Sequence, residues 1–301
     1  MKRKLILNVL IALIAIYTIG CGNSSDTKNA ENTEVTDEFA EAEDDFGQTF
    51  YRIPAPEEMF TFVKSGNLNY SSNLLNPTTN IDKYIDTRSK ELNFGVYAAD
   101  LAYSAAFHEF QGSLQYIDAI KKLSEAIEIS AIFNESLNGR IKNIFSHQDT
   151  LVNVTNSTYN RIVNHLEAND RGKTLALISA GGWLESIFIV TNLVSKYDPK
   201  NPTIQQIADQ KLTFENLMLY LEQYKDDPSV KTTIDDLQGI QKVFSQLETE
   251  KVENQNSGTG KGDVILLGAG SRIKITKEQF ELLKSNITSA RNKITGNTSN
   301  A

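Results

Sequence analysis

The stretch LALISAGGWLESIFIVTNLV, residues 175–194, decides the fold of this chain. Glu185 carries its only charge, so a helix here would have no polar face. A helix that is apolar all round is normally buried among other helices. The stretch FGVYAADLAYSAAF, residues 94–107, has the same character, with Asp100 as its only charge. The sequence therefore predicts two central, buried helices.

Hydropathy alone would also allow residues 175–194 to span a membrane. Glu185 near the middle argues against a span, because a charge inside the bilayer is costly. Gly181 and Gly182 together lower the helix propensity by about 1–2 kcal/mol, so some contact must compensate. We favour close approach of another helix to this bare backbone, with a kinked helix facing a pocket as the alternative.

Helical periodicity extends from Pro54 to about residue 250. Pro202 and Pro228 each follow acidic or amide residues and are placed to begin helices. Short connections favour antiparallel neighbours. We predict a mainly all-α fold, an antiparallel helical bundle or array of about eight helices around one core. A regular solenoid is the second choice, because the sequence has no repeat of fixed period.

The character of the sequence changes after this helical part. ENQNSGTGKG, residues 253–262, is polar and rich in glycine and predicts a flexible linker. DVILLGAGSRIKI, residues 263–275, predicts a small β-hairpin of two short strands about a glycine turn. Thr276, with Gln279 three residues later, forms the capping box of a C-terminal helix.

The N-terminus resembles the signal of a bacterial lipoprotein. Three positive residues at 2–4 precede a mostly apolar run at 5–20, the pattern of a secretory signal. Cys21, the only cysteine of the chain, follows Gly20 where this run ends. The resemblance implies cleavage before Cys21 and acylation by three chains of the palmitate type, enough for stable anchoring. An ordinary signal peptide with an incidental cysteine and an uncleaved anchor are the alternatives.

An acidic segment follows the cysteine. Residues 22–45 hold nine acidic residues and one lysine and too few apolar side chains to fold. We interpret this segment as a self-repelling spacer, with a surface-export signal as the alternative. The net charge of this segment is −8, the same as that of the whole chain. Because the three positive residues at 2–4 contribute +3, residues 46–301 carry a net charge of about −3. A nearly neutral folded part does not fit a nucleic-acid partner.

Residue 22 is glycine, not the aspartate that commonly retains lipoproteins in the inner membrane. We therefore expect lipid anchoring in the outer membrane, facing the periplasm rather than the cell surface. A lipidated Cys21 leaves no thiol for disulfides, catalysis or zinc. The predicted parts are a signal peptide at 1–20, an acidic tether at 21–50, an α-helical domain at 51–250, and a linker, hairpin and C-terminal helix at 251–301.

Asp100 and Glu185 are the candidates for a specific site, because a buried carboxylate is costly unless it is paired or protonated. His108 lies two turns beyond Asp100, and with Trp183 these residues could surround a ligand pocket. We favour a structural role, with each carboxylate satisfied by a core Arg or Lys, or by Tyr and Ser hydroxyls. The available arginines are Arg88, Arg140 and Arg161. Metal-ligand spacing is absent, so no metal or other cofactor is predicted.

Catalytic motifs fail on inspection. ISAGG lacks the spacing of a nucleophile elbow, and GTGKGD lacks that of a phosphate loop. GAGSRI lacks the third glycine of a dinucleotide fingerprint. An enzyme that uses buried carboxylates is therefore the third hypothesis, after a non-catalytic binding or scaffold protein and a solute-binding or sensor module.

Several segments are similar to an uncharacterised lipoprotein family of Bacteroidota. They include EMFTFVKSGNLNY, LLNP, LNFGVYAADLAY, LALISAGGWLES, QQIADQKLTFENL and ITKEQFELLKSNITSARNKI. The resemblance covers most of residues 54–294 and implies an envelope lipoprotein with a helical body. It brings no activity, substrate or site residue. We expect the membrane as one partner, through the acyl chains, and an envelope protein or a small ligand as another.

Overall fold

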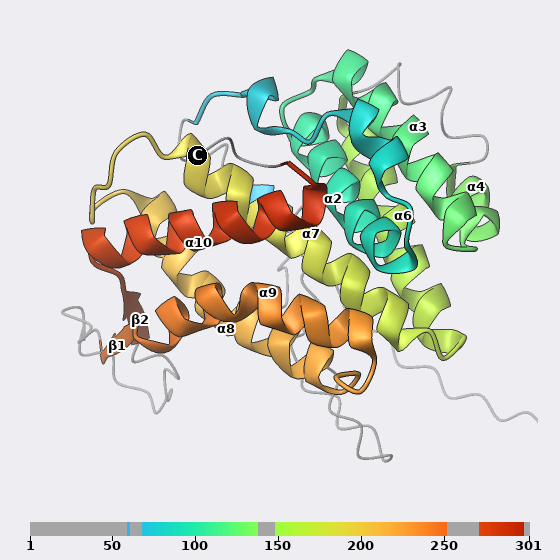
Figure 1. Ribbon diagram of the computed structural model, residues 1–301. Helices are drawn as coiled ribbons and strands as arrows, with labels where there is room; N and C mark the ends of the chain where they lie inside the picture. Colours follow the sequence, from blue (N-terminus) through green and yellow to red (C-terminus); the bar gives the residue numbers. More distant parts are fainter. Residues whose placement is uncertain (1–58, 61–67, 138–147, 252–270, 298–301) are drawn as a thin grey trace, which may run out of the picture. The chain divides into compact units, whose positions relative to one another are not determined.

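The computed structural model describes residues 59–60, 68–137, 148–251 and 271–297, which are mainly α-helical (Figure 1). Eight α-helices have their bounds there, seven in the part predicted to hold about eight, and α10 as the predicted C-terminal helix: α2 Thr87–Ala106, α3 Phe110–Ala126, α4 Ser130–Leu137, α6 Gln148–Ala168, α7 Gly172–Leu193, α8 Pro202–Glu222, α9 Pro228–Ser245 and α10 Lys277–Thr295. Two 3₁₀ helices, η1 Ser72–Leu74 and η2 Thr78–Lys83, precede α2. The predicted signal peptide, Cys21 and the acidic tether lie outside the described residues.

The two apolar stretches form α2 and α7, which pack against each other at the centre of the fold. Their backbones meet at two glycines. A Cβ atom added to Gly181 would lie 1.9 Å from the carbonyl oxygen of Leu92, and one added to Gly95 would lie 1.9 Å from that of Ile178. The predicted close approach of another helix to the glycines of α7 is therefore confirmed.

Helix α7 is the one described helix that is long and apolar enough to cross a membrane. Its most apolar 18-residue window is nevertheless completely buried by the rest of the protein. Core helices share this length and composition, so α7 is accounted for as the central helix of the fold.

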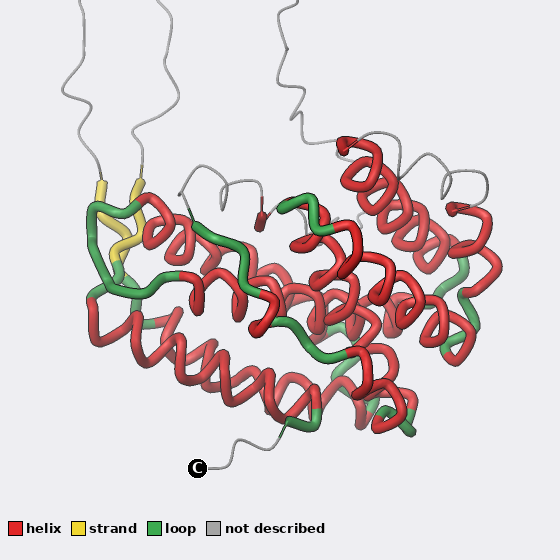
Figure 2. The backbone as a smooth tube through the Cα atoms, turned by 90° about the horizontal axis from the view of Figure 1, so that it is seen from above, coloured by secondary structure: helices red, strands yellow, loops and turns green. Residues whose placement is uncertain are grey.

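The remaining helices cover the central pair (Figures 1 and 2). Helices α3 and α6 pack on α2, and α4 packs on α6. Helices α8, α9 and α10 contact α7 from other directions, and α10 also reaches α2. Helix α10 is thus part of the main core, although the sequence predicted it as a C-terminal helix that follows a linker and a hairpin.

Helix starts follow the capping residues in the sequence. Asn201 accepts a hydrogen bond from the backbone N–H of Thr203 at 2.9 Å before α8. Asp227 caps α9 in the same way, and a proline begins both helices, as predicted. The capping box of Thr276 and Gln279 is confirmed at the start of α10.

The hairpin differs from its prediction. Strand β2, Ser271–Lys274, pairs antiparallel with β1, Glu248–Lys251, with Thr249 opposite Ile273. The expected partner of β2 was the apolar segment 263–267, and that pairing stays a prediction. That segment lies outside the described residues. Strand β1 includes residue 250, where the helical domain was predicted to end.

Candidate functional site

Glu185 lies on α7 and is held by Arg291 of α10. The guanidinium donates from Nε to Oε2 at 2.9 Å and from Nη2 to Oε1 at 2.8 Å. The side chains of Glu185 and Arg291 are 0% and 7% exposed. Arg291 also donates to the carbonyl oxygen of Leu74 at 3.3 Å and lies 4.5 Å from the ring centroid of Phe188. A planar guanidinium suits such a bidentate, buried contact better than an ammonium group would.

Asp100 of α2 is fully buried beside this ion pair. Its Oδ2 accepts a hydrogen bond from the backbone N–H of Asn76 at 3.2 Å. Its Oδ1 accepts no hydrogen bond in the described part of the chain. Burial, and next the charge of Glu185, raise the pKa of Asp100 well above its ordinary value, and Arg291 offsets this only in part. When Asp100 keeps its proton, its carboxyl group can donate a hydrogen bond to Glu185. The cluster then holds one cation, one anion and one neutral acid.

Amide and phenol groups extend this cluster toward η2. Asn76 donates from its side chain to the hydroxyl of Tyr84 at 2.8 Å and accepts from the side chain of Asn80 at 2.8 Å. The Tyr84 hydroxyl in turn donates to the carbonyl oxygen of Thr295 at 3.5 Å. Burial raises the pKa of Tyr84, which keeps its proton available for this contact. The network ties the segment before α2 to the end of α10.

The structure separates the other two predicted site residues from this cluster. Trp183 is two residues from Glu185, about 200° around the helix. Its indole N–H donates to Gln210 at 3.2 Å, and its ring lies 4.8 Å from that of Phe214 and 6.3 Å from that of Phe244. Trp183 therefore faces α8 and α9, whereas Glu185 faces α10.

His108 is not on the same helix as Asp100. Helix α2 ends at Ala106, and His108 follows in a left-handed conformation with φ of 61°. The next N–H, of Glu109, returns to the carbonyl oxygen of Ser104 at 2.8 Å, as in a Schellman motif. The predicted placement of His108 two helical turns beyond Asp100 is therefore wrong, because the chain reverses before it.

The structural role expected for the carboxylates is supported, but the expected arginines are not the partners. Arg88 binds Asp236 at 2.6 Å, and Arg161 binds Glu135 at 2.7 Å. Arg140 lies outside the described residues. The sequence signal for Arg291 is its place on the apolar face of α10. The buried residues of that face are Phe280, Leu283, Ile287, Ala290, Arg291, Ile294 and Thr295.

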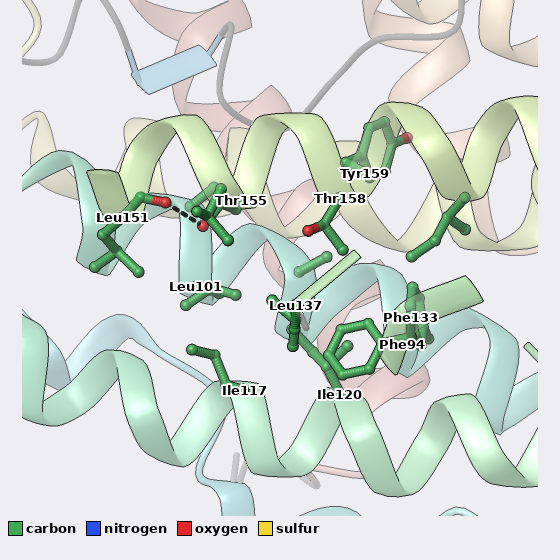
Figure 3. A pocket seen from close by; sticks show the side chains of 14 residues that line it. Phe94, Leu101, Ile117, Ile120, Phe133, Leu137, Leu151, Thr155, Thr158 and Tyr159 are labelled. Atoms are coloured by element: carbon green, nitrogen blue, oxygen red, sulfur yellow. Dashed lines mark hydrogen bonds between the residues drawn. The ribbon is translucent and has the colours of Figure 1, made fainter. Parts of the chain in front are cut away.

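A pocket lies elsewhere, between α2, α3, α4 and α6 (Figure 3). None of the four predicted ligand-binding residues lines it. Its walls include Phe94, Leu101, Ile117, Phe133, Leu151 and Thr158. Asp100 and Leu101 are adjacent in sequence, so α2 directs the polar cluster to one side and the pocket to another.

Asp100→Asn is expected to change the pH dependence of stability. The raised pKa means that the native state keeps a proton that the unfolded chain releases above about pH 4. The stability of the parent protein should therefore fall by about 1.4 kcal/mol per pH unit from there up to the native pKa. Asparagine has no such proton to lose, and its amide N–H can donate to Glu185 instead. Urea unfolding between pH 4.5 and 7.5 should show the variant gaining on the parent as the pH rises.

Parallel stability curves for Asp100→Asn and the parent would contradict a protonated Asp100. Asp86 supplies a matched control, because it is exposed and caps α2 by accepting from the N–H of Ser89 at 2.8 Å. Burial acts to raise the pKa of Asp86, but hydrogen bonds from Ser89 and the charge of Arg88 together outweigh it, so the pKa is lowered. Asp86→Asn should therefore alter the slope in the opposite direction, at more acidic pH.

Among the described residues, no group of three or more His, Cys, Asp or Glu side chains could hold a metal ion. The charged cluster at the centre of the fold is instead the Arg291–Glu185 ion pair with Asp100 beside it, and it is buried among protein groups. Comparisons with models of protein families, with curated proteins and with solved structures find no match for this chain.

Proposed function

We propose that this protein is a lipid-anchored lipoprotein of the cell envelope with a non-catalytic binding or scaffold role. The observation that carries the proposal is the Arg291–Glu185 pair, with Asp100 beside it. The two carboxyl groups best placed to do chemistry on a substrate are fully buried and engaged by protein groups. They hold α2, α7 and α10 together, which is a structural use of the charge.

The anchoring part of the proposal is supported by the N-terminal sequence. A positive cluster, an apolar run of signal length and a cysteine after Gly20 occur in the order of a lipoprotein signal. The acidic residues 22–45 then provide a spacer that repels itself and extends. We place the protein in the outer membrane, facing the periplasm, by the glycine at residue 22.

Cys21→Ser tests the anchor. The variant should lose metabolic labelling by palmitate and move from the membrane pellet to the soluble fraction, because no thiol remains to carry diacylglycerol. Asn23→Ser, two residues away, is the control and should fractionate and label like the parent. A Cys21→Ser variant that stays in the pellet at the parent's level would show that acylation does not hold the protein there.

A solute-binding or sensor role is the second candidate, and the pocket between α2, α3, α4 and α6 favours it. An apolar pocket with a few polar groups is the usual form of a small-ligand site. The pocket does not lie around Asp100, Trp183 and Glu185, where the sequence suggested one. A ligand-binding role would therefore use the opposite side of α2.

A further inference from the structure

We propose that the pocket between α2, α3, α4 and α6 binds one straight hydrocarbon chain whose polar end hydrogen-bonds to Thr158, as the acyl chain of a fatty acid or a membrane lipid would. The inference deepens the proposed binding role and rests on it for the source of the ligand, which is the membrane beside the anchor. The pocket itself is a property of the helical part.

The lining of the pocket selects an apolar ligand. Eleven of its fourteen residues have purely apolar side chains, and the other three carry hydroxyl groups. Leu101 of α2, Ile117 of α3 and Leu151 of α6 face the same space in Figure 3. An apolar cavity tends to stay dry and to take up apolar molecules, because water finds no hydrogen-bond partners in it. No lining side chain is ionisable below alkaline pH, so hydroxyl groups are the polar partners that the lining residues offer to a ligand.

The shape of the pocket selects a chain over a ring system. The unfilled space is about 540 Å³, including the part open to solvent. Water molecules could place their centres in only about 40 Å³ of it. The space is therefore narrow for its extent. A straight hydrocarbon is one methylene group wide along its whole length, so it suits a narrow space better than a ring system does.

Thr158 supplies the polar contact. Its side chain is buried, with 6% of the residue exposed, and its hydroxyl has no hydrogen-bond partner in the described part of the chain. Figure 3 shows this hydroxyl directed into the pocket from α6. A buried hydroxyl without a partner is costly, so a ligand oxygen that pairs with it gains affinity.

Neighbouring residues explain why Thr158 differs from most helical threonines. Thr155, one turn earlier, donates to the carbonyl oxygen of Leu151 at 2.9 Å. The corresponding carbonyl for Thr158 is that of Val154, which already accepts from the hydroxyl of Ser157 at 3.2 Å. The usual backbone contact is thus taken, and the hydroxyl of Thr158 turns to the pocket.

Photolabelling of the purified full chain in phosphatidylethanolamine vesicles tests the proposal. One probe is a twelve-carbon fatty acid with a diazirine in its chain, and the other is a phospholipid that carries the same acyl chain. Peptides are then mapped by mass spectrometry. We expect labels on peptides of α3 and α6 that line the pocket. Labelling by the acid alone identifies a free fatty acid as the ligand, whereas labelling by both probes identifies a membrane lipid.

Three variants make the result specific. Ala98→Phe adds a ring inside the pocket and should abolish the label, while Ala131→Phe, at an exposed position of α4, should keep it. Thr158→Val keeps the side-chain shape and should weaken binding about two- to tenfold, the value of one hydrogen bond. Label that is absent, or that survives in Ala98→Phe, would overturn the proposal. A failed anchor is seen separately, in the fractionation of Cys21→Ser.

Discussion

Replacement of Arg291 by methionine is expected to lower the free energy of unfolding by about 3–5 kcal/mol, since it leaves Glu185 buried without a counter-ion. Methionine keeps most of the apolar volume that Arg291 fills beside Phe188, so the loss reports the charge rather than a cavity. Urea denaturation at pH 7 measures the effect.

Arg161→Met is the matched control, because Arg161 forms a comparably short ion pair in solvent. Its contact with Glu135 is 2.7 Å, with side chains 38% and 68% exposed. Exposed pairs contribute about 0–1 kcal/mol, so this variant should stay close to the parent. A loss for Arg291→Met as small as that of the control would show that the buried pair does not hold the core.

The two members of the buried pair are not equivalent. Glu185→Gln leaves Arg291 charged, but Asp100 can then release its proton and become the counter-ion, since the charge of Glu185 helped to raise its pKa. We therefore expect a smaller loss for Glu185→Gln than for Arg291→Met. A double variant with apolar residues at both positions should recover much of the stability, as buried ion pairs often permit.

These stability effects also separate the two interpretations of the carboxylates. A ligand site built around Asp100 and Glu185 would keep or gain stability when either residue is replaced by alanine, because functional groups are often held under strain. A structural cluster loses stability instead. The bidentate contact with Arg291 and the hydrogen bond from Asn76 to Asp100 lead us to expect the loss.

The sequence was a good guide where one local rule decides the outcome. The absence of a polar face placed residues 175–194 in the core, and Thr276 with Gln279 located the start of α10. Arg291 escaped prediction because its partner, Glu185, is 106 residues away and nothing local pairs them. Only its position on an apolar helix face carried a signal.

Strand β1 and His108 show a second kind of limit. The residues of β1, ETEK, are polar, so strand propensity did not mark them as a partner of β2. Pairing with β2 and the buried Ile273 decide the strand, which is a tertiary effect. Helix α2 ends before His108, which takes the left-handed conformation that glycine usually adopts at a helix end. Because no glycine marks this end in the sequence, the predicted helix continued through His108.

Gly181→Ala is expected to cost about 3 kcal/mol or more, a larger effect than overpacking usually has. The added Cβ would lie 1.9 Å from the carbonyl oxygen of Leu92 and 2.8 Å from its carbonyl carbon. Both are backbone atoms of α2, so no side chain can rotate away. Helices α2 and α7 would have to move apart, and this would loosen apolar contacts along the whole central pair. Thermal and urea unfolding should both show the loss.

Gly112→Ala provides the control with the opposite sign. Gly112 lies in α3, and a Cβ there would have the Tyr70 hydroxyl as its nearest neighbour, at 3.7 Å, an ordinary contact. Alanine is the better helix former by about 1 kcal/mol, so this variant should be as stable as the parent or more so. If Gly181→Ala shared that gain, the backbones of α2 and α7 would have to lie farther apart than described. A loss of stability at Gly181 with a gain at Gly112 would instead establish the close approach of α2 and α7 as the contact that fixes the core.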